Sequence, residues 1–125
     1  MNPLKDRHPL EDLLRLFDDD RCYNKQGQQI SPAEHSALRQ DLSYMRIGND
    51  LALSVYRVST VWVGLPGCLF ETLVWVEGPG FKPCDVEALK WVYQTEPEAL
   101  AGHTAVVTQL NAGIDPRACK RPGAN

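Results

Sequence analysis

The stretch LALSVYRVSTVWVGLPGCLFETLVWVEG, residues 51–78, is rich in β-branched and aromatic residues, which favour β-strands. Pro66 and Gly67 stand near its middle. Proline presets the φ of the first central residue of a type II turn, and glycine accepts the positive φ of the second. The stretch therefore predicts a hairpin of two long strands joined by a tight turn, and the rest of the fold is organised around it.

If Pro66 faces Gly67, the register of this hairpin follows. Three pairs then share one face: Trp62 with Glu71, Thr60 with Leu73, and Val58 with Trp75. Both faces are largely apolar, so we expect helices or a second subunit to cover both. A slip of one residue would exchange the faces, and the sequence specifies the register only weakly because neither face is clearly polar.

Two capping boxes predict helices on either side of the hairpin. Ser31–Glu34 begins a helix that is expected to run to about residue 42 or 43, with His35 on its solvent side. Thr95–Glu98 begins another over residues 99–110, whose apolar stripe is Leu100, His103, Val107 and Leu110. Gly102 inside this helix predicts a close approach to the sheet.

A third helix is predicted over residues 9–17, where Leu10, Leu13, Leu14 and Phe17 recur at the spacing of one helix face. Residues 45–50 lead into the sheet, with a turn or bulge at Gly48–Asp50. Residues 78–85 form a loop dense in glycine and proline, where binding residues tend to lie. Leu89–Gln94 predicts a further strand with Trp91 and Tyr93 on one face.

These elements predict an α+β fold, with an antiparallel sheet of about three to five strands around the central long hairpin and two to three packed helices. The 125-residue chain is long enough for one domain, which we place at residues 1–110. Residues 111–125 read as a flexible basic tail, because they carry too little apolar surface to fold alone. We expect residues after about Asp115 to be dispensable for folding.

Composition excludes several classes of protein. The formal net charge of −3 argues against a dedicated duplex-DNA binder. No apolar run approaches the roughly 20 residues of a membrane span, and the first residues lack the apolar core of a signal peptide. We therefore expect a cytoplasmic protein that contacts neither membrane nor duplex DNA, and we predict no cofactor.

The four cysteines, Cys22, Cys68, Cys84 and Cys119, are widely spread and form no CxxC pair. Cys68, Cys84 and His103 could meet around the sheet, but the paired spacing of structural zinc sites is absent, so no metal site is predicted. We expect four reduced thiols, with Cys68 beside the turn the most exposed and the most readily modified.

The order of five segments resembles a family of small uncharacterised proteins carried by bacteriophages and prophages. They are YNKQGQQIS (23–31), YMRIGND (44–50), RVSTVWVGL (57–65), LFETLVW (69–75) and YQTEPEALAGH (93–103). The resemblance spans about residues 23–110, and its specific part is the pair VSTVWVGL and LFETLVW. It implies a phage or prophage origin and an accessory or anti-defence role. Family members have a longer, glycine-rich loop with Asp and His between the two strands, so a function housed there would be altered or lost in this chain.

Three residues invite a functional interpretation. Glu71 is the only charge between Leu69 and Val76, so we expect a raised pKa or a cationic partner. His103 lies on the apolar stripe of the last helix and could pair with Glu71 as acid and base, but a structural hydrogen bond is the more ordinary role. Arg57 could bind a phosphate or a partner carboxylate, or simply lie over a neighbouring apolar residue.

No triad, metal cluster or acid pair emerges, so the prediction is a binding protein and not an enzyme. The favoured function is inhibition of a host protein complex, such as a CRISPR-Cas effector, in the cytoplasm of the host cell. The alternative is an oligomeric sponge that sequesters a nucleotide second messenger of bacterial immunity, and both predict a homo-oligomer. The candidate binding residues are Arg57, Trp62, Glu71, Trp75, Phe81, Lys82 and His103.

Overall fold

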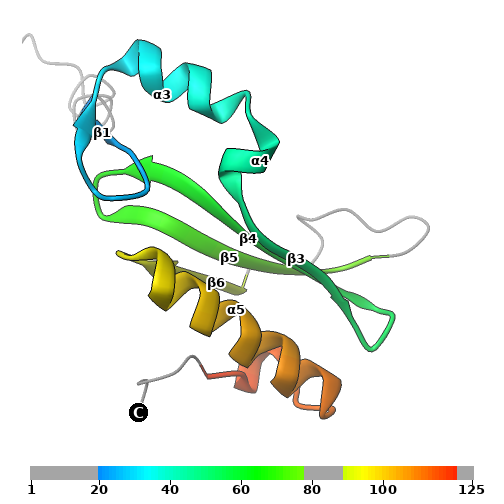
Figure 1. Cartoon of the computed structure of the whole chain (residues 1–125). Coiled ribbons are helices and arrows are strands. Elements are labelled where there is room, and N and C mark those ends of the chain that lie inside the picture. Colours follow the sequence, from blue (N-terminus) through cyan, green and yellow to red (C-terminus); the bar gives the residue numbers. More distant parts are fainter. Residues whose placement is uncertain (1–19, 78–88, 121–125) are drawn as a thin grey trace, which may run out of the picture.

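The computed structural model describes residues 20–77 and 89–120 as an α+β fold, which confirms the predicted class. The main sheet is antiparallel, with the strand order β3-β4-β5-β6, and α5 runs along one of its faces (Figure 1). Its strands are β3 (Arg46–Ala52), β4 (Tyr56–Leu65), β5 (Cys68–Val76) and β6 (Leu89–Tyr93). The helices are α3 (Pro32–Arg39), α4 (Leu42–Met45) and α5 (Glu96–Asn111), and β1 (Cys22–Tyr23) pairs with β2 (Gln29–Ile30) in a small second sheet. The helix predicted over residues 9–17 and the loop predicted over 78–85 lie outside the described residues.

The central hairpin β4–β5 forms, but most of its register differs from the predicted one by one residue. Leu65 pairs with Cys68 across the turn, as predicted, and Gly67 has a φ of +74°. A bulge then shifts the ladder, so that the pairs become Trp62 with Phe70, Thr60 with Thr72, and Val58 with Val74. Gly64 lies in the bulge with a φ of +70°, and a Cβ there would collide with the Tyr23 carbonyl oxygen. The shift therefore depends on glycine at residue 64.

The shift exchanges the faces that the simple register had predicted. Glu71, Leu73 and Trp75 now point to the opposite side of the sheet from Trp62 and Thr60, because side chains alternate along a strand. The expectation was that helices or a second subunit cover both faces. The described helices contact the sheet mainly on the face of Trp62 and Thr60, and the covering of the other face stays a prediction.

The 51–78 stretch also contains more than the predicted hairpin. Its first two residues complete β3, and a second turn at Leu53–Ser54 leads into β4. Both turn residues have positive φ, +51° for Leu53 and +58° for Ser54. Without glycine, asparagine or proline here, the sequence carries none of the usual signals for such a turn. The turn or bulge predicted at Gly48–Asp50 is not there, since these three residues pair regularly with β4; a bulge lies just before them, between Arg46 and Gly48.

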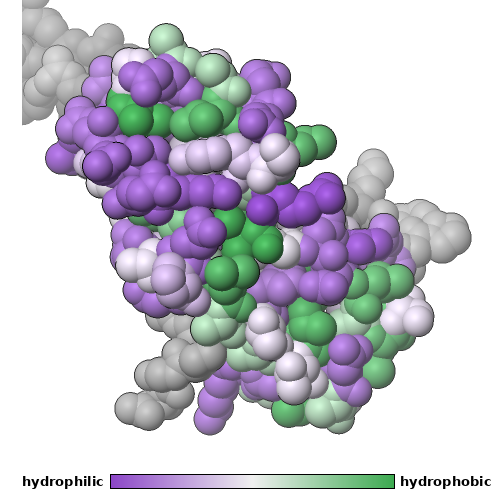
Figure 2. Space-filling model, in the orientation of Figure 1, coloured by the Kyte–Doolittle hydropathy of each residue, from purple (hydrophilic) through white to green (hydrophobic). Residues whose placement is uncertain are grey.

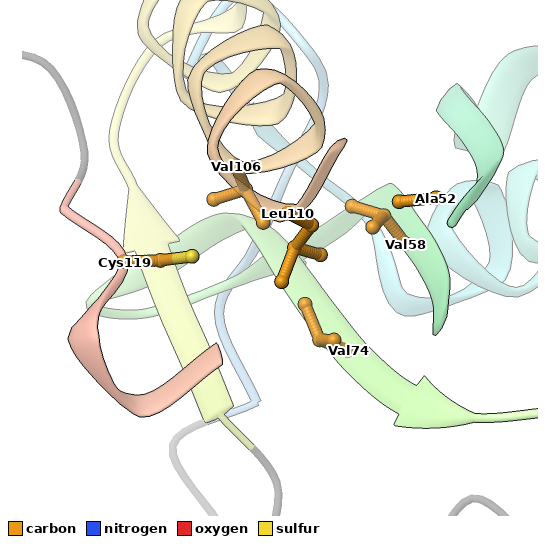
Figure 3. Packing of buried hydrophobic residues seen from close by; sticks show 6 residues of the cluster. All are labelled: Ala52, Val58, Val74, Val106, Leu110 and Cys119. Atoms are coloured by element: carbon orange, nitrogen blue, oxygen red, sulfur yellow. The ribbon is translucent and has the colours of Figure 1, made fainter. Parts of the chain in front are cut away.

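The core between α5 and the sheet is apolar. It joins residues of three strands, of α5 and of the segment that follows it: Ala52, Val58, Val74, Val106, Leu110 and Cys119. Figure 3 shows Val106 and Leu110 projecting from α5 into the cluster, and Cys119 reaching it from the segment that follows α5. None of the six is more than 8% exposed.

The buried stripe of α5 differs from the predicted one. His103 and Leu110 are buried as expected, whereas Leu100 is 48% exposed. Ala99, Gly102 and Val106 complete the buried face. A Cβ at Gly102 would overlap the Tyr93 ring, which confirms the predicted close approach of helix and sheet.

The helix predicted from Ser31 ends earlier than expected. Ser31 caps α3 by accepting from the Glu34 N–H, as predicted, but α3 ends at Arg39. Asp41 then caps a separate short helix, α4, by accepting from the N–H groups of Ser43 and Tyr44. The break arises because Asp41 can satisfy the first N–H groups of a new helix.

His35 is not a solvent residue, in contrast to the prediction. Its Nε2 lies 2.9 Å from the Val63 carbonyl oxygen, and its ring packs against Trp62 with centroids 5.1 Å apart. Tyr44 of α4 meets Trp62 edge-on at 4.9 Å. Trp62 is thus fully buried, and its Nε1–H donates to the Tyr23 carbonyl oxygen at 3.0 Å.

Residues 112–120, assigned above to the tail, pack against α5. A short 3₁₀ helix, η2 (Pro116–Ala118), brings Cys119 into the core at 8% exposure. Gln109 of α5 accepts from the Lys120 N–H at 2.8 Å, and its side-chain amide donates to the Lys120 carbonyl oxygen. Sequence composition missed this docking because it rests on a few contacts of Pro116, Cys119 and Lys120 and not on a run of apolar residues.

Candidate functional site

A chain of four side chains connects solvent to the middle of the sheet. Asp50 Oδ2 lies 2.6 Å from His103 Nε2, and His103 Nδ1 lies 2.7 Å from Thr60 Oγ1. Thr60 Oγ1 in turn lies 2.5 Å from Thr72 Oγ1. The chain joins β3, α5, β4 and β5, so it ties the helix to three strands at once. We call these four residues the polar relay.

The direction of the hydrogen bonds in the relay follows from the acceptor at its outer end. The Asp50 carboxylate accepts, so His103 donates from Nε2–H. When the imidazole is neutral, its other ring nitrogen is an acceptor, and Thr60 then donates its O–H to Nδ1. Thr72 then donates to Thr60. Every polar group of this buried chain therefore has a partner, as buried polar groups require.

Local sequence features bring the relay together. The register shift at Gly64 places Thr60 opposite Thr72, whereas the simple hairpin would have placed Leu73 there. Gly48 lies against the imidazole, since a Cβ at this position would be 2.6 Å from His103 Nε2. Glycine at residue 48 therefore leaves the room that the ring needs.

The relay contains a hydroxyl, an imidazole and a carboxylate, the groups of a nucleophile–base–acid triad. In such a triad the nucleophile faces the substrate and the carboxylate is shielded. Here the order is reversed, because Thr60 and Thr72 are 0% exposed whereas the Asp50 side chain is 56% exposed. In this arrangement a substrate has no path to the hydroxyls, and the relay can fix α5 on the sheet.

The predicted binding residues separate into three groups. Trp62 and His103 are buried on the α5 side of the sheet. Arg57, Glu71 and Trp75 lie on the opposite face, as the strand register places them. Phe81 and Lys82 lie outside the described residues. The sheet thus divides the residues that the sequence had grouped, and the polar relay adds Asp50, Thr60 and Thr72, which the sequence reasoning missed.

Glu71 has the cationic partner that its apolar surroundings predicted. Lys90 Nζ of the neighbouring strand lies 3.1 Å from Glu71 Oε2. The hydrogen bond and the charge of Glu71 raise the pKa of Lys90 above its usual value. His103 is not near this pair, because it lies on the other side of the sheet.

Arg57 is also paired within the chain. Its Nε–H donates to Glu77 Oε2 at 2.6 Å, and its NH1 group donates to Asn49 Oδ1 at 3.1 Å. These two contacts engage the Nε and NH1 donors of the guanidinium. A phosphate would have to displace Glu77 to use the same donors.

Cys68 is less available than its place beside the turn suggested. Burial raises the pKa of its thiol, and the nearby Glu71 carboxylate raises it further. Both effects lower the fraction of reactive thiolate. Cys22, Cys68 and Cys119 are free thiols, and no cluster of three or more possible metal ligands occurs within residues 20–77 and 89–120.

The Leu53–Ser54 turn is a second feature that the sequence did not predict. Three hydrogen bonds hold it: Val55 N–H to the Ala52 carbonyl at 3.0 Å, Leu53 N–H to Asn111 Oδ1 at 3.0 Å, and Glu77 N–H to the Val55 carbonyl at 2.8 Å. Leu53 is 48% exposed and Val55 is 41% exposed. We call these two side chains the turn patch.

Comparisons with known proteins found no matching family model, no similar curated protein and no similar solved structure. The resemblance to phage and prophage proteins therefore stays a prediction from the sequence. In the part of the chain that the structure describes, no helix combines the length and the apolar character needed to cross a membrane.

Proposed function

We propose that this chain is a phage- or prophage-encoded binding protein that acts without catalysis, as an inhibitor of a host defence complex such as a CRISPR-Cas effector. The phage origin and the defence target rest on the sequence resemblance. The observation that carries the binding role is the turn patch, where two exposed apolar side chains flank a turn that three hydrogen bonds hold in an unfavourable backbone conformation.

The backbone of the turn supports this role. Two consecutive non-glycine residues in the left-handed region cost roughly 1–2 kcal/mol each, and side chains such as leucine have no compensating local hydrogen bond. Asn-Gly would make the same turn without this cost. Strain of this kind is typical of functional sites, where the surrounding structure holds it in place.

The surroundings of the turn support the same conclusion. Its hydrogen bonds to Asn111 of α5 and to Glu77 fix its position before any partner binds, and preorganisation lowers the entropic cost of association. Figure 2 shows apolar residues gathered at the end of the molecule where β3 turns into β4, next to surface that is largely hydrophilic. An apolar cleft of a partner protein fits such a projection.

The polar relay supports the absence of catalysis. It is the one group of described residues that combines a hydroxyl, an imidazole and a carboxylate in hydrogen-bond contact, and its hydroxyls are 0% exposed. Catalysis requires these groups to meet a substrate.

The sponge alternative requires Arg57, Trp62, Glu71 and His103 to line one pocket between subunits, whereas Trp62 and His103 are buried within a single copy, at 0% and 7% exposure. In a single copy of the chain Trp62 and His103 lie on one side of the sheet, and Arg57 and Glu71 lie on the other. No observation therefore favours this alternative over a protein partner.

The test uses a panel of bacterial strains, each carrying one type of CRISPR-Cas effector programmed against a lytic phage. Plaques are counted with and without expression of the chain. We expect plaque formation to recover in at least one strain, and failure in every strain would contradict the proposed target. Asp50→Asn tests the non-catalytic role, because the exposed Asp50 can lose its charge without unfolding the protein. Recovery should persist in the folded variant, and its loss would indicate that the acid–base pair takes part in chemistry.

A further inference from the structure

The face of the main sheet opposite α5 is a second interaction surface. The strand register assigns eleven side chains to it: Arg46, Asn49, Leu51, Arg57, Ser59, Val61, Glu71, Leu73, Trp75, Lys90 and Val92. We call this surface the open face. Its members on β4 and β5 are all partly exposed, whereas Val58, Thr60, Phe70 and Thr72 on the α5 side are fully buried.

The middle of the open face is apolar. Val61, Leu73 and Trp75 lie on the two central strands and remain partly exposed, and Leu51 on β3 is 45% exposed. Among residues 20–77 and 89–120, the helices reach the sheet through its other face. A contiguous apolar surface of this kind marks an interaction site.

Two charge pairs lie on and beside this face, and the exposed Arg46 stands at its β3 edge. Glu71 pairs with Lys90, and Arg57 pairs with the neighbouring Glu77. The outer members of the pairs, Lys90 and Glu77, are 49% and 47% exposed, which places them at the rim. A surface that covers the centre of the face, away from Arg46, therefore needs no charge of its own, because burying an unpaired charge is what makes an interface costly to desolvate. A copy of the same face, which is equally apolar and equally paired, meets this condition.

The size of the face fits a dimer. Strands of seven, ten, nine and five residues, at about 3.3 Å per residue and about 4.8 Å between strands, give a footprint of roughly 500 Å². Two such footprints bury about 1,000 Å², which is the lower limit for a specific interface. Two sheets can pack in this way, with their inner side chains interlocked.

We propose that a second copy of this chain covers the open face, in an isologous dimer built by packing the two sheets face to face. A two-fold axis near the middle of β5 brings Leu73 to the centre of the contact, with Trp75 beside it. The pairs Arg57–Glu77 and Lys90–Glu71 surround this centre. The turn patch lies at the turn between β3 and β4, so the dimer presents two copies of it to a partner.

The test is sedimentation equilibrium of the purified full chain across low to high micromolar concentration. We expect the mass of a dimer, which Leu73→Arg converts to the mass of a monomer. Leu100→Arg is the matched control. Leu100 is 48% exposed on α5, and α5 packs on the face of the sheet opposite the open face. We expect this control to remain a dimer.

Folding of each variant is followed by its thermal melting transition. If Leu73→Arg fails to fold, Trp75→Ser at the same face provides the second reading, and it should also weaken the dimer. A wild-type monomer at the highest concentration would overturn the proposal, as would a dimer that both folded open-face variants preserve. This result is independent of the plaque assay, which reports on the host target.

Discussion

Asp50 on β3 and His103 on α5 meet at 2.6 Å between Oδ2 and Nε2, at the solvent end of a hydrogen-bonded chain that finishes at two fully buried threonines. The contact joins residues 53 positions apart and fixes the helix across the strands. The exposed end of the relay is the Asp50 carboxylate, and neither threonine hydroxyl reaches the surface. Its role in holding the fold can be measured.

The buried threonines should contribute as a pair. Thr60→Val leaves the His103 Nδ1 without its donor and the Thr72 hydroxyl without its acceptor, so we expect a loss of about 1–3 kcal/mol in the free energy of unfolding. In Thr60→Val with Thr72→Val, the second substitution should cost less than it does alone, because its hydroxyl has already lost its partner. Urea denaturation measures all three variants. Strict additivity would show that the two hydroxyls do not interact.

Gly48 should be intolerant of a side chain for a specific reason. Gly48→Ala places a Cβ 2.6 Å from His103 Nε2, so the ring must move and the Asp50 contact is lost. We expect a destabilisation of about 1–3 kcal/mol, which is typical of overpacking. In a His103→Ala background the same change should cost much less, and an equal cost in both backgrounds would show that the imidazole is not the obstacle.

The reactivity of Cys68 should depend on Glu71. Burial and the Glu71 carboxylate both raise the pKa of the Cys68 thiol, so alkylation by iodoacetamide at pH 8 should be slower than for an ordinary cysteine and should accelerate as the pH rises. Glu71→Gln removes the negative charge and leaves Lys90, which lowers this pKa. Alkylation at Cys68, followed by peptide mass mapping, should therefore be faster in this variant. An unchanged or slower rate would contradict the assigned cause.

The segment after α5 should be needed for full stability. Truncation after Gly113 removes the buried Pro116 and Cys119 and the two hydrogen bonds between Gln109 and Lys120. We expect a lower melting temperature, since buried apolar contacts are lost. The sequence alone had predicted that residues after about Asp115 are dispensable. An unchanged melting curve would restore that prediction.

Local signals in the sequence predicted much of the fold. The capping boxes at Ser31 and Thr95 start helices in the structure, and the Pro66–Gly67 turn closes the central hairpin. Each of these signals acts within four residues, where backbone chemistry decides the outcome. Trp91 and Tyr93 share a face as predicted for the same reason, because strand periodicity is local.

The candidate site depended on features that no local pattern carries. Gly64 could have been read as a strand residue, and only its fit against the Tyr23 carbonyl explains the bulge that brings Thr60 opposite Thr72. His103 was identified on its helix, but Asp50 lies inside β3, where the sequence had predicted a turn or bulge at Gly48–Asp50. The positive φ of Leu53 opposes its own preference, so tertiary contacts had to impose it.

The most direct test of the binding role compares plaque recovery by two variants of the turn. Ser54→Gly relieves the strain at residue 54 and keeps Leu53, so inhibition should persist. Leu53→Asn with Ser54→Gly makes the favoured Asn-Gly turn, so the protein should melt at a higher temperature while the exposed leucine is gone. We predict that this more stable protein no longer restores plaques in the strain where the wild type does. Equal plaque recovery by the two variants would contradict the turn patch as the binding surface.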